Sequence, residues 1–173
     1  MKEVQRYYGK YRGVVIQPVD PQTDGRIVAS VTVGGVPLQV VADACMAFGG
    51  PGMGLFAVPP TLSGVWIEFL EGDINKPVWS GCWWPEGQLQ ISLGMAAKLA
   101  SLPIVMQSMA GNRLVINTVG PDCVVLETVA ADLGPRIALS LTGIKLSFGP
   151  TVTIELSADG VSICGKALQV LPV

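Results

Sequence analysis

The sequence predicts an all-β protein in two parts, a small N-terminal barrel and a C-terminal stack of short strands. Within residues 64–69 apolar side chains alternate with Trp66 and Glu68, the period of a strand with one buried face. From residue 113 onward, apolar runs of about five residues alternate in the same way between Gly and Pro turns. Ten of the eleven aromatic residues precede residue 85, and only Phe148 follows it. Because a narrow stack has no room for aromatic fillers, we place the boundary near residues 84–87.

The N-terminal part contains about five expected strands, which suits a small closed barrel. The strands are expected at residues 11–16, 26–33 and 37–42 and, as a hairpin, within residues 64–84. Turn residues separate them at 20–25, at Gly34-Gly35 and at the acidic turn Glu71-Gly72-Asp73.

Residues 51–84 carry a pattern more specific than turn chemistry requires. A Pro-Gly-x-Gly turn, a strand with Trp and Glu, and a hairpin beginning Gly-Asp and ending in Trp follow one another. The residues of this pattern are Pro51, Gly52, Gly54, Trp66, Glu68, Gly72, Asp73, Pro77, Trp79, Gly81 and Trp84. In this order they resemble the OB-fold domain of contractile-tail spike proteins: phage baseplate assembly protein V, the cell-puncturing spike of myophages and the valine-glycine repeat proteins of type VI secretion. The opening of the chain fits the same family at Tyr11, Gly13, Val15, Asp20, Pro21, Gly25, Arg26 and Ile27.

With no helix and no aromatic core, the C-terminal strands cannot close a globule alone. Three copies wound about one axis would bury every apolar stripe, and the resemblance implies such a triple-stranded β-helix. The predicted trimer core is Ile137, Leu139, Leu141, Ile144, Leu146, Val152, Ile154, Leu156, Val161 and Ile163. The expected domains are an OB-fold at residues 1–84, a neck at 85–112 whose conformation stays open, and an intertwined trimeric β-helix at 113–173.

Composition favours an oligomer. Half of the residues are hydrophobic and 14% are charged, which is unusually apolar for a soluble monomer. No stretch reads as a spanning helix, because Lys98, Pro103 and several Gln and Ser residues interrupt residues 87–111. The first residues are charged without an apolar segment, so no signal peptide is expected.

Charge and residue usage argue against several functions. The net charge is −2 and no basic stripe is present, so we expect no nucleic-acid partner. The chain has no histidine, the commonest general base and metal ligand. We therefore expect no enzyme activity, no metal and no cofactor. The widely spaced cysteines, which are Cys45, Cys82, Cys123 and Cys164, suit isolated buried thiols.

Two other functions stay open. A monomeric OB-fold module could bind oligosaccharide or nucleic acid on Trp79, Trp83 and Trp84. An enzyme could use the carboxylates of Glu68, Glu71 and Asp73. The alternating C-terminal half counts against the first, and the missing histidines count against the second.

The resemblance implies a structural protein. It implies a homotrimeric central spike, or hub, at the end of a tail tube, which pierces the target cell envelope on contraction. The implied partners are other copies of the chain, tail tube and baseplate hub proteins, and a PAAR-type tip protein over the apolar C-terminal end. The implied location is a phage tail or an injection particle assembled in the bacterial cytoplasm. In that family the loop at residues 50–54 lies near trimer and tube contacts.

Overall fold

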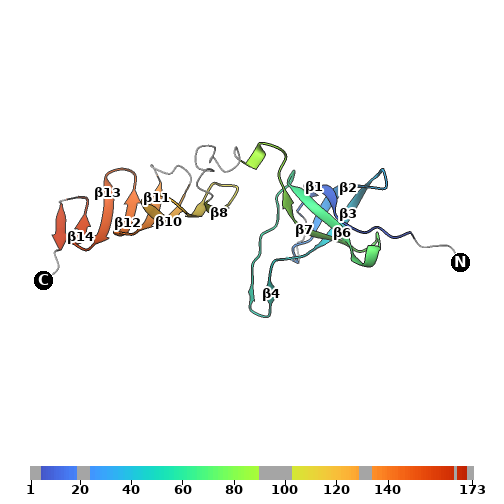
Figure 1. The fold of residues 1–173 in the computed structure, drawn as a ribbon, viewed down its shortest axis with the longest axis horizontal. Helices are drawn as coiled ribbons and strands as arrows, with labels where there is room; N and C mark the ends of the chain where they lie inside the picture. The colour runs from blue at the N-terminus through green and yellow to red at the C-terminus, as the bar shows by residue number, and fades with distance from the viewer. Residues whose placement is uncertain (1–4, 19–23, 90–102, 129–133, 166, 171–173) are drawn as a thin grey trace. The chain divides into compact units, whose positions relative to one another are not determined.

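The computed structural model describes residues 5–18, 24–89, 103–128, 134–165 and 167–170. The chain divides into two compact units, Met1–Leu89 and Gln90–Val173, and in the described residues of both the regular secondary structure is almost all strand (Figure 1). The predicted all-β class is therefore confirmed. The expected turn at Asp20-Pro21, residues 90–102 of the neck and the last three residues lie outside the described residues.

The first unit is a closed five-stranded barrel, as the sequence predicts. Its strands are β1 (Tyr11–Gln17), β2 (Ile27–Val33), β3 (Val36–Ala44), β6 (Gly64–Phe69) and β7 (Pro77–Trp83). Around the barrel they run in the order β1-β2-β3-β7-β6. All neighbours are antiparallel except β3 and β7, which pair in parallel through Asp43 and Ala44. A single 3-10 turn, η1 (Leu70–Gly72), connects β6 to β7.

The barrel core follows from period-2 alternation. In β2 the odd-numbered positions from Ile27 to Val33 point inward and are buried, whereas Ser30 and Thr32 point outward. The buried set is Val15, Ile27, Ala29, Val31, Val33, Val40, Ala42, Val65, Ile67, Phe69 and Trp79. The rings of Tyr7 and Tyr11 lie against Phe69 and close this core from one side.

Between β3 and β6 the chain leaves the barrel as a narrow arm, which we define as residues 47–57. Its two short strands, β4 (Gly49–Gly50) and β5 (Met53–Gly54), pair across the Pro51-Gly52 turn. The arm projects away from the barrel strands (Figure 1). The Pro-Gly-x-Gly pattern is thus the tip of a ribbon.

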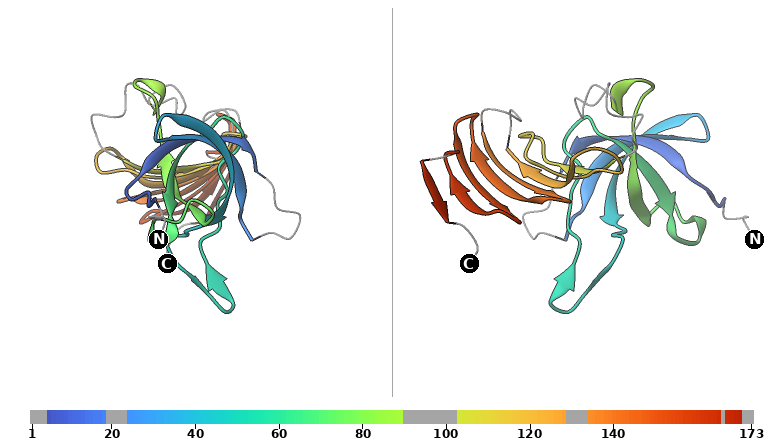
Figure 2. Two further views of the ribbon diagram at one scale, coloured as in Figure 1. Left: turned by 90° about the vertical axis from the view of Figure 1, so that its right-hand side faces the viewer. Right: turned by 60° about the vertical axis from the view of Figure 1, so that its left-hand side comes forward.

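The second unit is a single eight-stranded antiparallel sheet in which each strand pairs with its neighbour in the sequence (Figure 2). Its strands are β8 (Ile104–Gln107), β9 (Arg113–Ile116), β10 (Asp122–Glu127), β11 (Pro135–Ser140), β12 (Gly143–Phe148), β13 (Val152–Ser157), β14 (Gly160–Ile163) and β15 (Leu168–Val170). Every alternating run named from the sequence falls on one of these strands, except at Leu141, which follows the end of β11.

Candidate interaction surface

One face of the C-terminal sheet is apolar across all eight strands. Register places Leu139 opposite Ile144, Ile144 opposite Leu156, and Leu156 opposite Val161. Because directly paired residues share a face, these side chains form a ladder across the sheet. We call the apolar face the set Ile104, Met106, Leu114, Ile116, Val124, Leu126, Ile137, Leu139, Ile144, Leu146, Phe148, Val152, Ile154, Leu156, Val161, Ile163, Leu168 and Val170.

The chain itself leaves the apolar face largely uncovered. Leu146 is 40% exposed and Ile154 41%, although both lie in the middle of the sheet. Phe148 is 60% exposed. Single exposed apolar side chains are ordinary on soluble proteins, but a contiguous face of them marks an interaction site.

The opposite face is charged or small, which we call the charged face. Glu127, only 7% exposed, accepts a bond from Arg113 Nε at 2.5 Å and lies 3.4 Å from Arg136 Nε. Arg136 also pairs with Asp122 at 2.6 Å. Beside this network a small cluster of Val115, Val125 and Ala138 is buried. The charged side chains of this network are therefore paired within the chain, whereas the apolar face is left for a partner.

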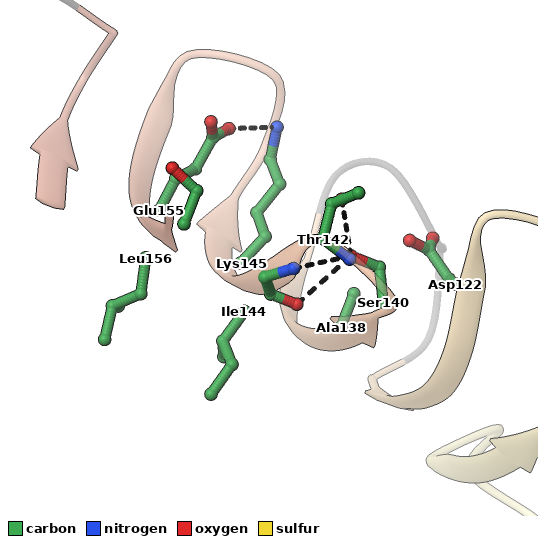
Figure 3. A pocket seen from close by; sticks show the side chains of 10 residues that line it. Asp122, Ala138, Ser140, Thr142, Ile144, Lys145, Glu155 and Leu156 are labelled. Atoms are coloured by element: carbon green, nitrogen blue, oxygen red, sulfur yellow. Dashed lines mark hydrogen bonds and ion pairs between the residues drawn. The ribbon is translucent and has the colours of Figure 1, made fainter. Parts of the chain in front are cut away.

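The two faces can be seen side by side at β12 and β13. The Lys145 ammonium pairs with Glu155 at 2.6 Å, while Ile144 and Leu156 extend to the other side (Figure 3). An open pocket on the charged face is lined in part by Asp122, Ser140 and Thr142. The Ser140 hydroxyl there accepts bonds from the backbone of Thr142 and Gly143, so it stabilises the β11–β12 turn.

All predicted trimer-core residues except Leu141 lie on the apolar face. Leu141 shares the odd parity of Ile137 and Leu139, but it stands in the β11–β12 turn and is 92% exposed. The sequence prediction omitted these members of the face: Ile104, Met106, Leu114, Ile116, Val124, Leu126, Phe148, Leu168 and Val170. The alternation of these residues indicates that each strand has one apolar face. The register between strands is needed to show that these faces lie on the same side of the sheet.

In the barrel, Trp66, Trp79 and Trp83 make contacts within the chain. Trp79 is 4% exposed, and its indole Nε1 donates to the Gly25 carbonyl at 3.0 Å. Trp83 Nε1 donates to the Val65 carbonyl at 3.1 Å. The Arg12 guanidinium lies 5.7 Å from the Trp66 ring centroid and 5.0 Å from that of Trp83, within cation–π range.

The remaining pattern residues shape turns and strand starts. Gly72 has φ +74, and a Cβ there would meet Tyr8, Arg6 and the Tyr7 backbone within 3.1 Å. Gly81 has φ +92 inside β7, and Pro77 begins that strand. Trp84 follows β7 and is 54% exposed. These positions explain why the pattern needs glycine, but they assemble no chemical site.

Of the carboxylates considered for catalysis, Glu68 and Asp73 are held in their charged forms. Glu68 accepts bonds from Lys10 and Ser80, and these bonds lower the pKa of its carboxyl. The pKa of Asp73 is lowered by hydrogen bonds from Asn75, first from its backbone N–H. A general acid needs a raised pKa. The lowered pKa values of these carboxyls therefore favour a structural role over a catalytic one.

The cysteine prediction needs correction. In the single chain Cys45, Cys82 and Cys164 are exposed and Cys123 is half-buried, so one chain alone does not bury these thiols. Cys164 has φ +47 and stands in the turn after β14. A cysteine's apolar character does not reveal that it occupies a turn. Among the described residues, no group of three or more metal-ligating side chains comes together.

No helix in the described part of the chain is long and apolar enough to cross a membrane.

Two family models match the chain. The first is the type VI secretion system/phage-baseplate injector OB domain, which matches residues 11–84. The second is the phage baseplate V C-terminal trimerisation domain, which matches residues 103–169. The first coincides with the barrel, and the second spans the sheet that carries the apolar face. No individual curated protein matches the chain.

Proposed function

Because the chain belongs to the family of phage baseplate V and type VI spike-type proteins, we propose that it forms the homotrimeric central spike of a contractile tail or injection system. Members of these families are structural components of baseplates and spikes. The proposed role is accordingly mechanical, with no catalytic step.

The observation that carries the proposal is the apolar face. Exposing it to water would be unfavourable, and burying it against copies of itself removes apolar area from water in proportion to the area covered. The match to a trimerisation domain over the same strands favours three copies. The charged face would then point outward, where its ion pairs keep the assembly dispersed.

Strand pairing within the chain suggests how three copies would meet. In the described part of this sheet, strands β9 to β14 pair with a neighbour of the same chain on both sides, and β8 and β15 are the edges. Three sheets would therefore pack through their apolar faces as the walls of a three-sided prism, with side chains interdigitating at the axis. Such a prism would be a stiff rod, because backbone hydrogen bonds within each wall resist shear together.

The remaining assignments follow from the family. We propose that the barrels form the base of the spike at the end of the tail tube, in contact with tube and baseplate hub proteins. The prism would transmit the thrust of contraction to the target cell envelope. A PAAR-type tip protein would cover the apolar end near Leu168 and Val170, which are 55% and 59% exposed.

The solution mass of the purified full chain, measured by light scattering, tests the trimer. We expect about three times 18.1 kDa. A stable mass of one chain would contradict the spike and would leave the apolar face unexplained.

The alternative, a monomeric module for oligosaccharide or nucleic acid, receives less support from the barrel. It needs free aromatic faces, whereas Trp79 is buried and Trp83 lies beneath Arg12. Ligand-dependent tryptophan fluorescence in a chain that stays monomeric would favour this alternative.

A further inference from the structure

The barrel unit carries two apolar surfaces that its own chain does not cover. The first is the arm, where Phe48 is 52% exposed, Met53 64% and Leu55 44%. From residue 44 to residue 67 the sequence contains no charged side chain. An uncharged projecting ribbon with two Phe, a Met and a Leu on its surface has the composition of an interface anchor.

The second surface lies on the outside of β1, β2 and β3. Val14 is 38% exposed, Ile16 40% and Val41 57%. Val28, half-buried, lies directly opposite Val41 in the β2–β3 ladder, and its other ladder partner is Gln17 beside Ile16. We call this set, Val14, Ile16, Val28 and Val41, the barrel patch. In β2 the next outward position after Val28 is Ser30, which lies opposite Val14 in β1 and Gln39 in β3. The apolar set therefore stops at Val28 and Val41 in β2 and β3 and reaches Val14 in β1.

Threefold symmetry makes a specific demand on these surfaces. A ring of three identical subunits is held by heterologous contacts, in which one surface of each copy meets a different surface of the next. The apolar face of the C-terminal sheet can meet its symmetry mates at the axis, but a ring of barrels needs two complementary surfaces on each barrel. The arm and the barrel patch are two such surfaces, and both are apolar.

We propose that the arm of each copy docks on the barrel patch of the next copy, so that three arms close a ring of three barrels. This inference rests on the proposed trimer and adds a contact to it. The docked arm would place Met53 and Leu55 over Val14, Ile16 and Val41, removing both surfaces from water. Flexible Met53 at the tip would adapt to the ridges between strands.

The test places the photo-cross-linking residue p-benzoylphenylalanine at position 53 of the full chain, in place of Met53. Irradiation of the purified trimer should yield covalent species of two and three chains. Mass spectrometry should map the linked peptide to residues 12–17 or 26–43. The same photo-residue in place of Lys76, which is exposed in the η1–β7 turn, provides the matched control and should not link to those peptides.

A second variant separates this proposal from the trimer itself. Val41→Glu puts a charge on the barrel patch at a position already 57% exposed in the single chain, so the barrel should still fold. With the photo-residue at position 53, this variant should lose the cross-link down to the control level while light scattering still gives the triple mass. Cross-links that stay within one chain, or that reach another region, would overturn the arm contact. So would a trimer that gives no cross-link at position 53, whereas a mass of one chain would overturn the spike.

Discussion

At the scale of single residues, the barrel exterior is organised around Trp83. Its ring lies beneath the Arg12 guanidinium, and its Nε1 ties it to the Val65 carbonyl. The same residue excludes a side chain at position 64, because a Cβ on Gly64 would lie 2.6 Å from the Trp83 backbone oxygen. The glycine that opens β6 and the tryptophan that ends β7 therefore pack directly against each other, and position 64 has no room for a side chain.

The contribution of Glu68 to the stability of the barrel should depend on pH. Hydrogen bonds from Lys10 and Ser80 hold its pKa below the ordinary value of 4.5. Its contribution to stability is therefore present above about pH 4.5 and is lost as the pH falls through the lowered folded value. Because the Glu68 side chain is 41% exposed, Glu68→Gln should cost at most about 1 kcal/mol at pH 7.

Thermal unfolding of the barrel, measured for wild type and Glu68→Gln between pH 7 and pH 3, checks this prediction. The difference in Tm should shrink as the solution becomes more acidic. Lys10→Met is the matched control, because it removes the same ion pair from the other side and should follow the same pH course. A difference that widens toward low pH would contradict the assignment.

At the scale of elements, Gly143 sets the spacing between β12 and β13. A Cβ at this position would lie 2.0 Å from the Leu156 backbone oxygen. Gly143→Ala must therefore separate the two strands locally, and we expect the free energy of unfolding to fall by about 1–3 kcal/mol, the range of overpacked positions. Denaturant unfolding measures the loss. Thr142→Ala, at the exposed neighbouring position, should change it by no more than about 0.5 kcal/mol. Equal midpoints for both variants would contradict the close approach.

The elements also show where sequence reasoning succeeds and where it stops. Period-2 alternation predicts the five barrel strands and the strands β9 to β14, because each of them has one face that must avoid water. It does not predict β8, which lies within the expected neck at residues 85–112. Alternation does not show where a strand ends, so the pattern that predicts Ile137 and Leu139 also predicts Leu141, which stands in a turn. It also does not show which strands share a face, so the predicted core lacks Leu114 and Leu126, which pair directly. Register depends on pairing between strands, and single-strand patterns do not contain it.

At the scale of the whole molecule, composition anticipated a surface that the chain cannot bury. Only 14% of the residues are charged, and the charged residues of the C-terminal sheet gather on one face. The identity of that face, and the presence of a second pair of apolar surfaces on the barrel, required the structure. The arm gives little pattern to read, because glycine and proline dominate its tip and its strands are two residues long.

A charged substitution on the apolar face should prevent trimer formation, and Leu141, which lies outside this face, provides the control. In Ile154→Asp, three copies would each bring a carboxylate to the trimer axis, and an unpaired buried charge costs several kcal/mol. We expect light scattering to give the mass of one chain for this variant, and the same for Leu146→Asp. Leu141→Asp introduces an identical side chain at a position that is 92% exposed, so it should keep the triple mass. Circular dichroism should show that all three variants retain strands. A triple mass for Ile154→Asp would mean that the apolar face does not join the copies, and a single mass for Leu141→Asp would place the β11–β12 turn in the interface.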